Sequence, residues 1–321
     1  MSELLKTIDA RTKLAGTNKL EILLFFLGVD QRTGRRETFG INVFKVREVM
    51  RTPQITAAPE MPAAVEGMVS LRGALVPVVD LAKYAGVTAT TPRDIMIVTE
   101  YNGHTQGFLV ESVDTILRLD WSKMRVPPEM LTAQLGGLVT AVTELDDNRL
   151  VMMMDVEKVL SETTNYDDEI MFRGVQPLDM PDVTVYFCDD SVVARRQIER
   201  TLQHMQVKYV SAINGRAMWD ELSKIADYAI SVGKPVTDFV SLVLTDIEMP
   251  EMDGYILTKK VKSDPRLEGV SVIMHSSLSG MSNQKLGISV GVDEYVPKFE
   301  PQRLAETLIR RLGASLPSEA V

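Results

Sequence analysis

Charged and hydroxyl side chains stand at the ends of several apolar runs in the second half of this 321-residue chain. The runs cover residues 183–188, 240–245, 270–274 and 294–296. The polar residues that follow them are Asp189, Asp190, Asp246, Ser276, Ser277 and Lys298. If the runs are neighbouring parallel strands, their carboxyl ends meet at one edge of a sheet, so these side chains should converge there.

Carboxylates that lie close together repel one another unless a cation lies between them. Oxygen ligands of this kind favour Mg²⁺, which keeps several waters and commonly binds together with a phosphate group. Lys298 would supply a positive charge to the remaining phosphate oxygens, and Ser276 would supply a hydroxyl donor. The set predicts a Mg²⁺-assisted phosphate site.

Each member also has an ordinary structural interpretation. An Asp pair after a strand is more often the N-cap of the next helix than a metal site, and Asp190 or Ser191 could be that cap. A lysine near a strand end is usually solvated, and paired serines are common in loops. The combination is far less expected by chance than any single member.

The elements that would position these residues alternate between apolar runs and amphipathic helices. Apolar residues recur at helical spacing in three places: Ala194, Ile198, Leu202 and Met205; Met218, Leu222, Ile225 and Ala229; and Leu304, Leu308 and Leu312. With a further strand at 208–213, the pattern predicts five βα units. This indicates a doubly wound α/β domain whose five-stranded parallel sheet is covered by helices.

The first half is instead rich in strand-like segments separated by turn signals such as Asn102-Gly103,. This spacing predicts small antiparallel barrels, preceded by a short helix at residues 4–14. No catalytic set assembles in residues 1–160, because His104 on a predicted hairpin turn has no Ser or Cys nucleophile beside it,.

The overall composition is that of a globular protein of about two domains. A net charge of −9 argues against a nucleic-acid-binding surface,. Cys188 is the only cysteine, so a disulfide framework is excluded and a reducing compartment is expected,. The apolar stretch at 22–27 is too short to cross a bilayer, which predicts a soluble cytoplasmic chain without membrane insertion,.

The order and spacing of the polar residues resemble the receiver domain of two-component response regulators over residues 182–315. The residues that carry the resemblance are Asp189-Asp190, Asp246, Met249-Pro250, Asp253-Gly254, Ser276 and Lys298. The resemblance implies that Asp246 is the phospho-acceptor, which attacks the phosphohistidine of a partner kinase.

The resemblance also implies roles for the neighbours of Asp246. Asp190 and Asp246 would bind Mg²⁺ with the backbone carbonyl of Glu248, and Asp189 would assist from the same pocket. Ser276 and Lys298 would hold the phosphoryl oxygens. Tyr295 occupies the position of the aromatic residue that rotates inward when a receiver signals.

Three features depart from the usual receiver pattern. Ser276 stands where threonine is usual, and Phe299 follows Lys298 where a proline is usual. The number of residues between Asp190 and Asp246 is also larger than is typical. The additional residues, around 227–238, are assigned to a longer second helix and the loop that follows it.

The segment EGMVSLRGALVPVVDL, residues 66–81, resembles the CheW family of chemotaxis coupling proteins, and the resemblance extends over residues 18–160. That family has two five-stranded SH3-like barrels and no catalysis, and it links membrane chemoreceptors to the CheA histidine kinase. The resemblance makes Arg72 a candidate receptor contact and places the CheA-binding side near Val46 and Val49. A structural role for Arg72, bracing the two barrels, is an equal alternative.

A CheW-like domain followed by a receiver is the arrangement of the CheV family, which this chain resembles. The predicted parts are a helix at 1–17, the coupling domain at 18–160, a linker at 161–181, the receiver at 182–315 and a tail at 316–321. The predicted location is the cytoplasmic face of the inner membrane, at chemoreceptor arrays.

The predicted function is chemotaxis coupling, in which phosphorylation of Asp246 by CheA tunes coupling or makes the receiver a phosphate sink. The chain is not expected to be an enzyme in the usual sense. One alternative is a Mg²⁺-dependent phosphatase or hydrolase with Asp246 as nucleophile, and another is a constitutive adaptor with a vestigial receiver.

Overall fold

The computed structural model describes residues 19–57, 59–88, 91–101, 104–134, 136–163, 171–178, 180–277 and 289–313. The chain divides into two compact units, one of Lys19–Asn165 and one that contains Tyr166–Val321. The helix expected at 4–14 and the Asn102-Gly103 turn lie outside the described residues. No helix within these ranges is long and apolar enough to cross a membrane.

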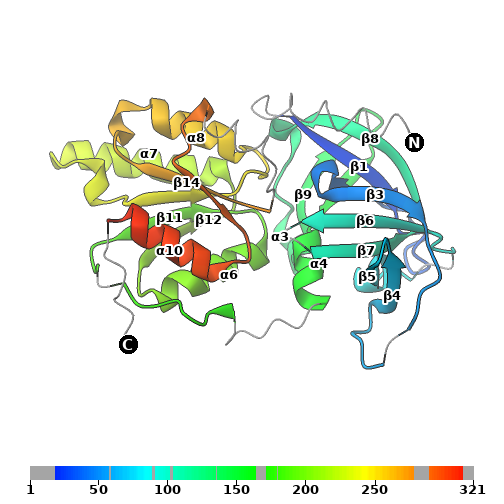
Figure 1. The fold of residues 1–321 in the computed structure, drawn as a ribbon. Coiled ribbons are helices and arrows are strands. Elements are labelled where there is room, and N and C mark those ends of the chain that lie inside the picture. Colours follow the sequence, from blue (N-terminus) through cyan, green and yellow to red (C-terminus); the bar gives the residue numbers. More distant parts are fainter. Residues whose placement is uncertain are drawn as a thin grey trace, which may run out of the picture. The chain divides into compact units, whose positions relative to one another are not determined.

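The second unit is built on one parallel sheet in the strand order β12-β11-β13-β14-β15 (Figure 1). Its strands are β11 (Thr184–Cys188), β12 (Lys208–Ala212), β13 (Leu242–Thr245), β14 (Ser271–Ser276) and β15 (Glu294–Pro297). The three central strands are nearly continuous runs of buried residues because helices cover both faces of the sheet,. The prediction of a five-stranded parallel domain is confirmed.

Two layers of helices cover this sheet. Helices α6 (Val192–His204) and α10 (Pro301–Arg311) share one apolar core with the sheet, and α7 (Gly215–Ser231) and α8 (Gly254–Ser263) share another. In Figure 1, α7 and α8 lie on one side of the strands and α6 and α10 on the other. The surplus residues before β13 lengthen α7 and form the short 3₁₀ helix η4 (Val236–Asp238).

The first unit contains two five-stranded sheets, in the orders β8-β1-β2-β10-β9 and β3-β6-β7-β5-β4. The strands are β1 (Lys19–Phe26), β2 (Thr38–Asn42), β3 (Val46–Arg51), β4 (Val65–Leu71), β5 (Ala74–Asp80), β6 (Ile95–Tyr101), β7 (His104–Val110), β8 (Ser112–Asp120), β9 (Val139–Glu144) and β10 (Leu150–Met154). The prediction of purely antiparallel barrels was wrong in one respect, because β2 pairs with β10 in parallel, and so does β5 with β7. In each case other strands intervene, so the chain can return in the same direction.

Short helices complete the first unit. They are η2 (Val43–Lys45), α2 (Leu81–Tyr84), η3 (Trp121–Lys123), α3 (Glu129–Gln134) and α4 (Val156–Thr163). Val156, Val159 and Leu160 of α4 pack into a core that both sheets share. Helix α4 of the first unit therefore spans residue 160, where the sequence predicts the end of the coupling domain.

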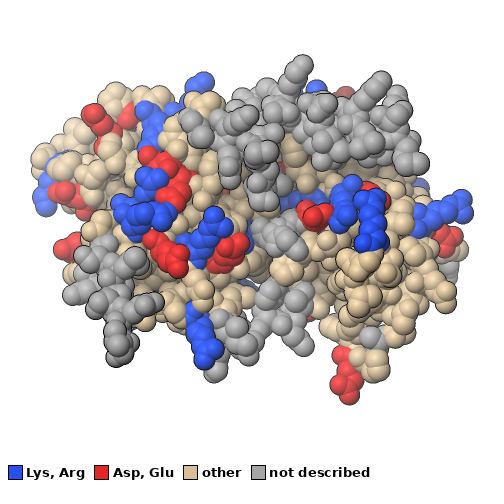
Figure 2. Space-filling model, in the orientation of Figure 1, with Lys and Arg blue, Asp and Glu red and all other residues tan. Residues whose placement is uncertain are grey.

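Lys and Arg side chains lie beside Asp and Glu side chains on the visible face of the second unit (Figure 2). One such group surrounds the start of β15, where Arg310 and Arg311 pair with Glu294, and Lys262 pairs with Asp293. Exposed pairs of this kind contribute little stability individually, but several charges in one network fix the positions of their side chains better than a single pair.

Candidate functional site

The carboxyl ends of β11, β13 and β15 lead directly into Asp189, Asp246 and Lys298. Sheet hydrogen bonds continue past the strand ends: the Asp246 N–H donates to the Cys188 carbonyl at 2.9 Å, and the Lys298 N–H donates to the Ser276 carbonyl at 3.2 Å. These bonds hold the backbone beneath each side chain in register. The predicted residues are therefore brought together at one edge of the sheet.

Three carboxylates meet at this edge. Asp189, Asp190 and Asp246 each place one oxygen within 4.8 Å of the others. The Lys298 Nζ lies 2.8 Å from Asp189 Oδ2 and 3.2 Å from Asp246 Oδ2. The side chain of Lys298 is only 2% exposed, so its charge is accommodated by these carboxylates rather than by water,.

The charge at this edge suits a divalent cation. Three carboxylates against one ammonium leave an excess of negative charge among groups that are buried or half-buried. Such oxygen ligands are those that Mg²⁺ prefers. Asp189, Asp190 and Asp246 fit the expected ligands in residue type and in their closeness to one another.

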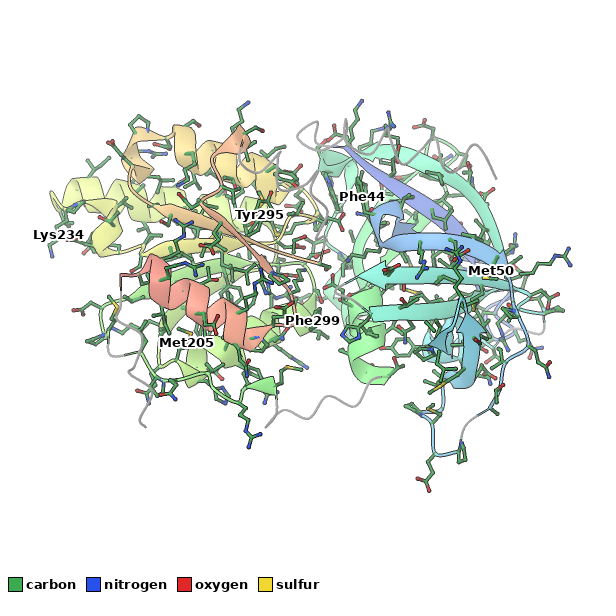
Figure 3. The ribbon with its side chains drawn as sticks, viewed as in Figure 1. Phe44, Met50, Met205, Lys234, Tyr295 and Phe299 are labelled. Carbon is green, nitrogen blue, oxygen red and sulfur yellow. The ribbon has the colours of Figure 1, made fainter. Side chains whose placement is uncertain are left out.

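The hydroxyl and aromatic residues of the predicted site lie on the neighbouring strands. Ser276 is the last residue of β14, Ser277 follows it, and each is 5% exposed. Tyr295 lies half-buried on β15. Figure 3 labels it there. In the strand register, Met274 lies opposite Tyr295 and Ser276 lies opposite Pro297.

Ser191 caps the helix that follows the aspartate pair. Its hydroxyl oxygen accepts from the Ala194 N–H at 3.3 Å and caps α6. Asp189 Oδ1 in turn accepts from the Ser191 N–H at 2.9 Å, which fixes the first carboxylate. Of the two candidate residues, Ser191 is therefore the N-cap of α6.

Asp253-Gly254 shapes the loop that follows Asp246. The Asp253 carboxylate accepts from the Ile256 N–H at 2.7 Å and caps α8. A Cβ added to Gly254 would lie 2.0 Å from the Asp246 carbonyl oxygen, so only glycine permits this approach,. The two motif residues hold the start of α8 against the end of β13.

Both halves of the chain match known families. Residues 24–164 match the CheW-like domain, and residues 185–309 match the response regulator receiver domain. Chemotaxis protein CheV2 of Helicobacter pylori is 26% identical over 329 residues, which cover 97% of this chain and 100% of the relative. The chain belongs to the CheV-type chemotaxis proteins.

Relatives with only one of the two domains align with the corresponding part of this CheV-type protein. Chemotaxis protein CheW of Klebsiella aerogenes is 31% identical, over 47% of this chain and 87% of the relative. Chemotaxis protein CheY1 of Helicobacter pylori is 34% identical, over 40% of this chain and 94% of the relative. The two-domain fold and the chemotaxis coupling function predicted from sequence are confirmed.

Sequence reasoning missed two residues beside the CheV-type site. Arg195 on α6 donates from Nη1 to the Asp189 carbonyl at 2.6 Å, one helical turn after the aspartate pair. Tyr255 is 4% exposed and hydrogen-bonds through its side chain to Tyr295. Burial, and then the neighbouring Tyr295, raise the pKa of the Tyr255 phenol. Helical spacing could have indicated Arg195, whereas the tyrosine pair depends on packing between α8 and β15.

Cys188 is a buried residue at the end of β11. Its thiol donates to Thr245 Oγ1 at 3.3 Å, and that hydroxyl donates to the Asp246 carbonyl at 2.8 Å. Burial raises the pKa of the Cys188 thiol well above its ordinary value. The neutral thiol therefore serves as a small core side chain on β11, beside the end of β13,.

Arg72 in the CheW-like domain lies at the turn between β4 and β5, with φ 51°. Its Nη2 lies 3.1 Å from Glu48 Oε2 on β3, and its side chain is 69% exposed. Strands β3 and β4 are the two ends of one sheet order, so the pair joins the ends of a single sheet. Arg72 thus does not brace one sheet against the other through this pair.

The proposed CheA-side residues differ in exposure. Val46 is buried in the core of the CheW-like domain, and Val49 packs partly buried against it. Arg47 and Arg51 are the exposed residues of the same strand. A partner that binds here would touch the arginines, with the two valines supporting the strand from beneath.

Proposed function

We propose that this chemotaxis coupling protein accepts a phosphoryl group on Asp246 from a CheA-type histidine kinase. The observation that supports the proposal is the cluster of three carboxylates within 4.8 Å, with the Lys298 ammonium against Asp189 and Asp246. Coupling proteins of the CheV and CheW type are in general not enzymes. The proposed role is therefore that of a phosphate-accepting adaptor.

In the transfer step, a carboxylate oxygen of Asp246 attacks the phosphorus and forms the new O–P bond. The P–N bond to the kinase histidine breaks, and its electron pair returns to the imidazole. Asp189, Asp190, Asp246 and the Glu248 carbonyl would hold Mg²⁺, which when bound would offset the negative charge of the phosphate. Lys298 and Ser276 would bind the remaining oxygens, and Tyr295 would respond to the movement of Ser276.

The proposed partners can be assigned to parts of the CheW-like domain. The CheW-like domain would contact chemoreceptors near Arg72 and the kinase along β3, in the cytoplasm at receptor arrays. Phosphorylation adds about −1.5 to −2 charges at the site, which gives the receiver a means to tune coupling or to act as a phosphate sink.

The deciding experiment is phosphotransfer from radiolabelled CheA-type kinase in the presence of Mg²⁺. Wild type should take up label that Asp246→Ala does not, and Asp220→Ala, which removes an exposed carboxylate on α7, should label normally. Absence of label from wild type would favour a constitutive adaptor with a vestigial receiver. Sustained turnover of phosphate esters would favour the hydrolase alternative.

A further inference from the structure

A segment before the first strand of the receiver lies against α6. We call residues 171–178 and Met180 the strap. The Phe172 ring, 6% exposed, stacks on the His204 imidazole with centroids 4.7 Å apart and an interplanar angle of 4°. The guanidinium carbon of Arg200, one turn earlier on α6, lies 4.7 Å from the centre of the same ring. Phe172 is therefore held by two side chains of α6.

The other end of the strap is part of the receiver core. The Leu178 N–H donates to the Met205 carbonyl at 2.8 Å, just past the end of α6. Leu178 belongs to the same apolar cluster as residues of α6 and α10, and Val175 and Met180 pack against that cluster. The strap is thus docked at both ends, in a region where the sequence predicts a linker.

Two further contacts tie the strap to the second turn of α6 and to the first turn of α10. Gln197 Nε2 donates to Met171 Sδ at 3.6 Å, and Gln302 Nε2 donates to the Arg173 carbonyl. Gln302 lies in the first turn of α10, which begins just after Lys298 and Phe299. Figure 3 labels Phe299 at this junction between β15 and α10.

Both helices that hold the strap begin at the aspartate site. Helix α6 starts at Val192, just after Asp190, and its Arg195 also donates to the Asp189 carbonyl. Helix α10 starts just after Lys298, whose ammonium touches two of the carboxylates. Because a helix moves as a rigid element, a displacement at its first turn reaches the residues that grip the strap.

We propose that docking of the strap on α6 and α10 is energetically coupled to phosphorylation of Asp246. The inference rests on the proposed function. The strap follows the CheW-like domain and precedes the receiver in the chain. A change in strap docking at phosphorylation would therefore alter the segment that connects the two domains. Coupling of this kind is reciprocal. If docking of the strap changes the affinity of the aspartate site for its ligand by some factor, then ligand binding must change the docking equilibrium of the strap by the same factor.

The test measures that reciprocity on the full-length protein. Beryllofluoride with Mg²⁺ serves as the phosphoryl analogue, and its dissociation constant is measured by titration calorimetry. Phe172→Ala and Gln302→Ala should both change this constant in the same direction, by about fivefold or more. In wild type, beryllofluoride should change the hydrogen-exchange protection of the Leu178 amide by a comparable factor.

Two control variants leave the strap contacts in place. Arg303→Ala removes an exposed arginine that follows Gln302 in the chain and pairs with Glu300. Tyr228→Ala removes an exposed aromatic side chain of α7. Both should bind beryllofluoride within about twofold of wild type, as expected for surface substitutions. Gln302 is itself exposed, so its variant tests the proposal even if Phe172→Ala fails to fold.

The outcomes separate the two proposals. If the strap variants release the strap in hydrogen exchange but bind beryllofluoride like the controls, docking is uncoupled and this inference is overturned. If wild type itself fails to bind beryllofluoride, the proposed phosphorylation is overturned, and the inference with it.

Discussion

The Lys298 ammonium lies 2.8 Å from the Asp189 carboxylate, and the two side chains are 2% and 0% exposed. This pair connects the end of β15, at the edge of the sheet, to the end of β11, which neighbours the β13 strand that leads into Asp246. A lysine so deeply buried requires its carboxylate partners, and they in turn require a cation.

Replacement of Lys298 should therefore make folding depend on Mg²⁺. Lys298→Met keeps most of the aliphatic volume but leaves three adjacent carboxylates without the ammonium, which should lower the free energy of unfolding by about 3–5 kcal/mol. Mg²⁺ should restore more stability to this variant than it adds to wild type, because the cation replaces the lost charge. Urea unfolding with Mg²⁺ and with a chelator measures both effects.

The control for this prediction is Lys259→Met, which removes an exposed ammonium from α8. Its stability should stay within about 0.5 kcal/mol of wild type in either condition. A loss in Lys298→Met that Mg²⁺ leaves unchanged would show that packing, and not charge, accounts for the role of Lys298.

Gly254 should tolerate no side chain. In an exposed helix, Gly→Ala commonly adds stability, but here the new Cβ would meet the Asp246 carbonyl oxygen at 2.0 Å,. The backbone at the end of β13 or at the start of α8 must shift, so Gly254→Ala should lose more than about 2 kcal/mol of unfolding free energy. Thermal unfolding of this variant beside Lys259→Ala, on the same helix, makes the comparison; equal melting temperatures would contradict it.

The residues of the receiver site were largely predictable because they directly follow the ends of strands. Once β11, β13 and β15 are recognised as parallel, chain direction alone brings Asp189, Asp246 and Lys298 to one edge,. Strand periodicity supplies that recognition without any knowledge of side-chain packing. The sequence left Asp190 and Ser191 as equal candidates for the cap of α6, and only the structure decides for Ser191. The close contact of Gly254 with the Asp246 carbonyl depends on how α8 packs, which no local pattern specifies.

Contacts between distant segments were not predictable from periodicity. The parallel pairing of β2 with β10 joins strands separated by most of the first unit, and nothing local in either strand specifies its partner,. The docking of Phe172 on α6 was concealed for a different reason: polar and acidic neighbours make the strap resemble a linker. The Tyr255–Tyr295 contact likewise depends on how α8 lies against β15.

Arg72 and Glu48 allow receptor binding to be separated from sheet stability. If Arg72 contacts the receptor directly, Arg72→Ala should weaken receptor pulldown about tenfold, whereas Glu48→Ala should have a smaller effect. If the ion pair only joins β3 to the β4–β5 turn, the two substitutions should act equally, and because the pair is exposed both effects should be small,. Kinase pulldown from the same preparations checks that the domain remains folded.

Cys188 should be unreactive in the folded protein. Burial raises its thiol pKa, so the fold favours the neutral form, and this contribution to stability is complete below the unfolded pKa and is lost as pH rises toward the folded value,. Between about pH 7 and pH 9 the native protein should react slowly with a disulfide reagent, while the urea-unfolded chain reacts faster as pH rises. A native reaction that titrates like a free thiol would contradict this account.

Tyr255 and Tyr295 should be coupled through their side-chain hydrogen bond. Both rings pack in the apolar cluster of Ile247, Tyr255 and Met274. Removal of either hydroxyl would break the hydrogen bond between the two tyrosines in this mostly buried site. A double-mutant cycle of Tyr255→Phe and Tyr295→Phe in urea unfolding should give a coupling energy of about 1 kcal/mol. Additive effects would show that the tyrosines act independently. A measured coupling would mean that Tyr255 holds the orientation of Tyr295, so Tyr255→Phe should also ease any movement of Tyr295 that follows phosphorylation.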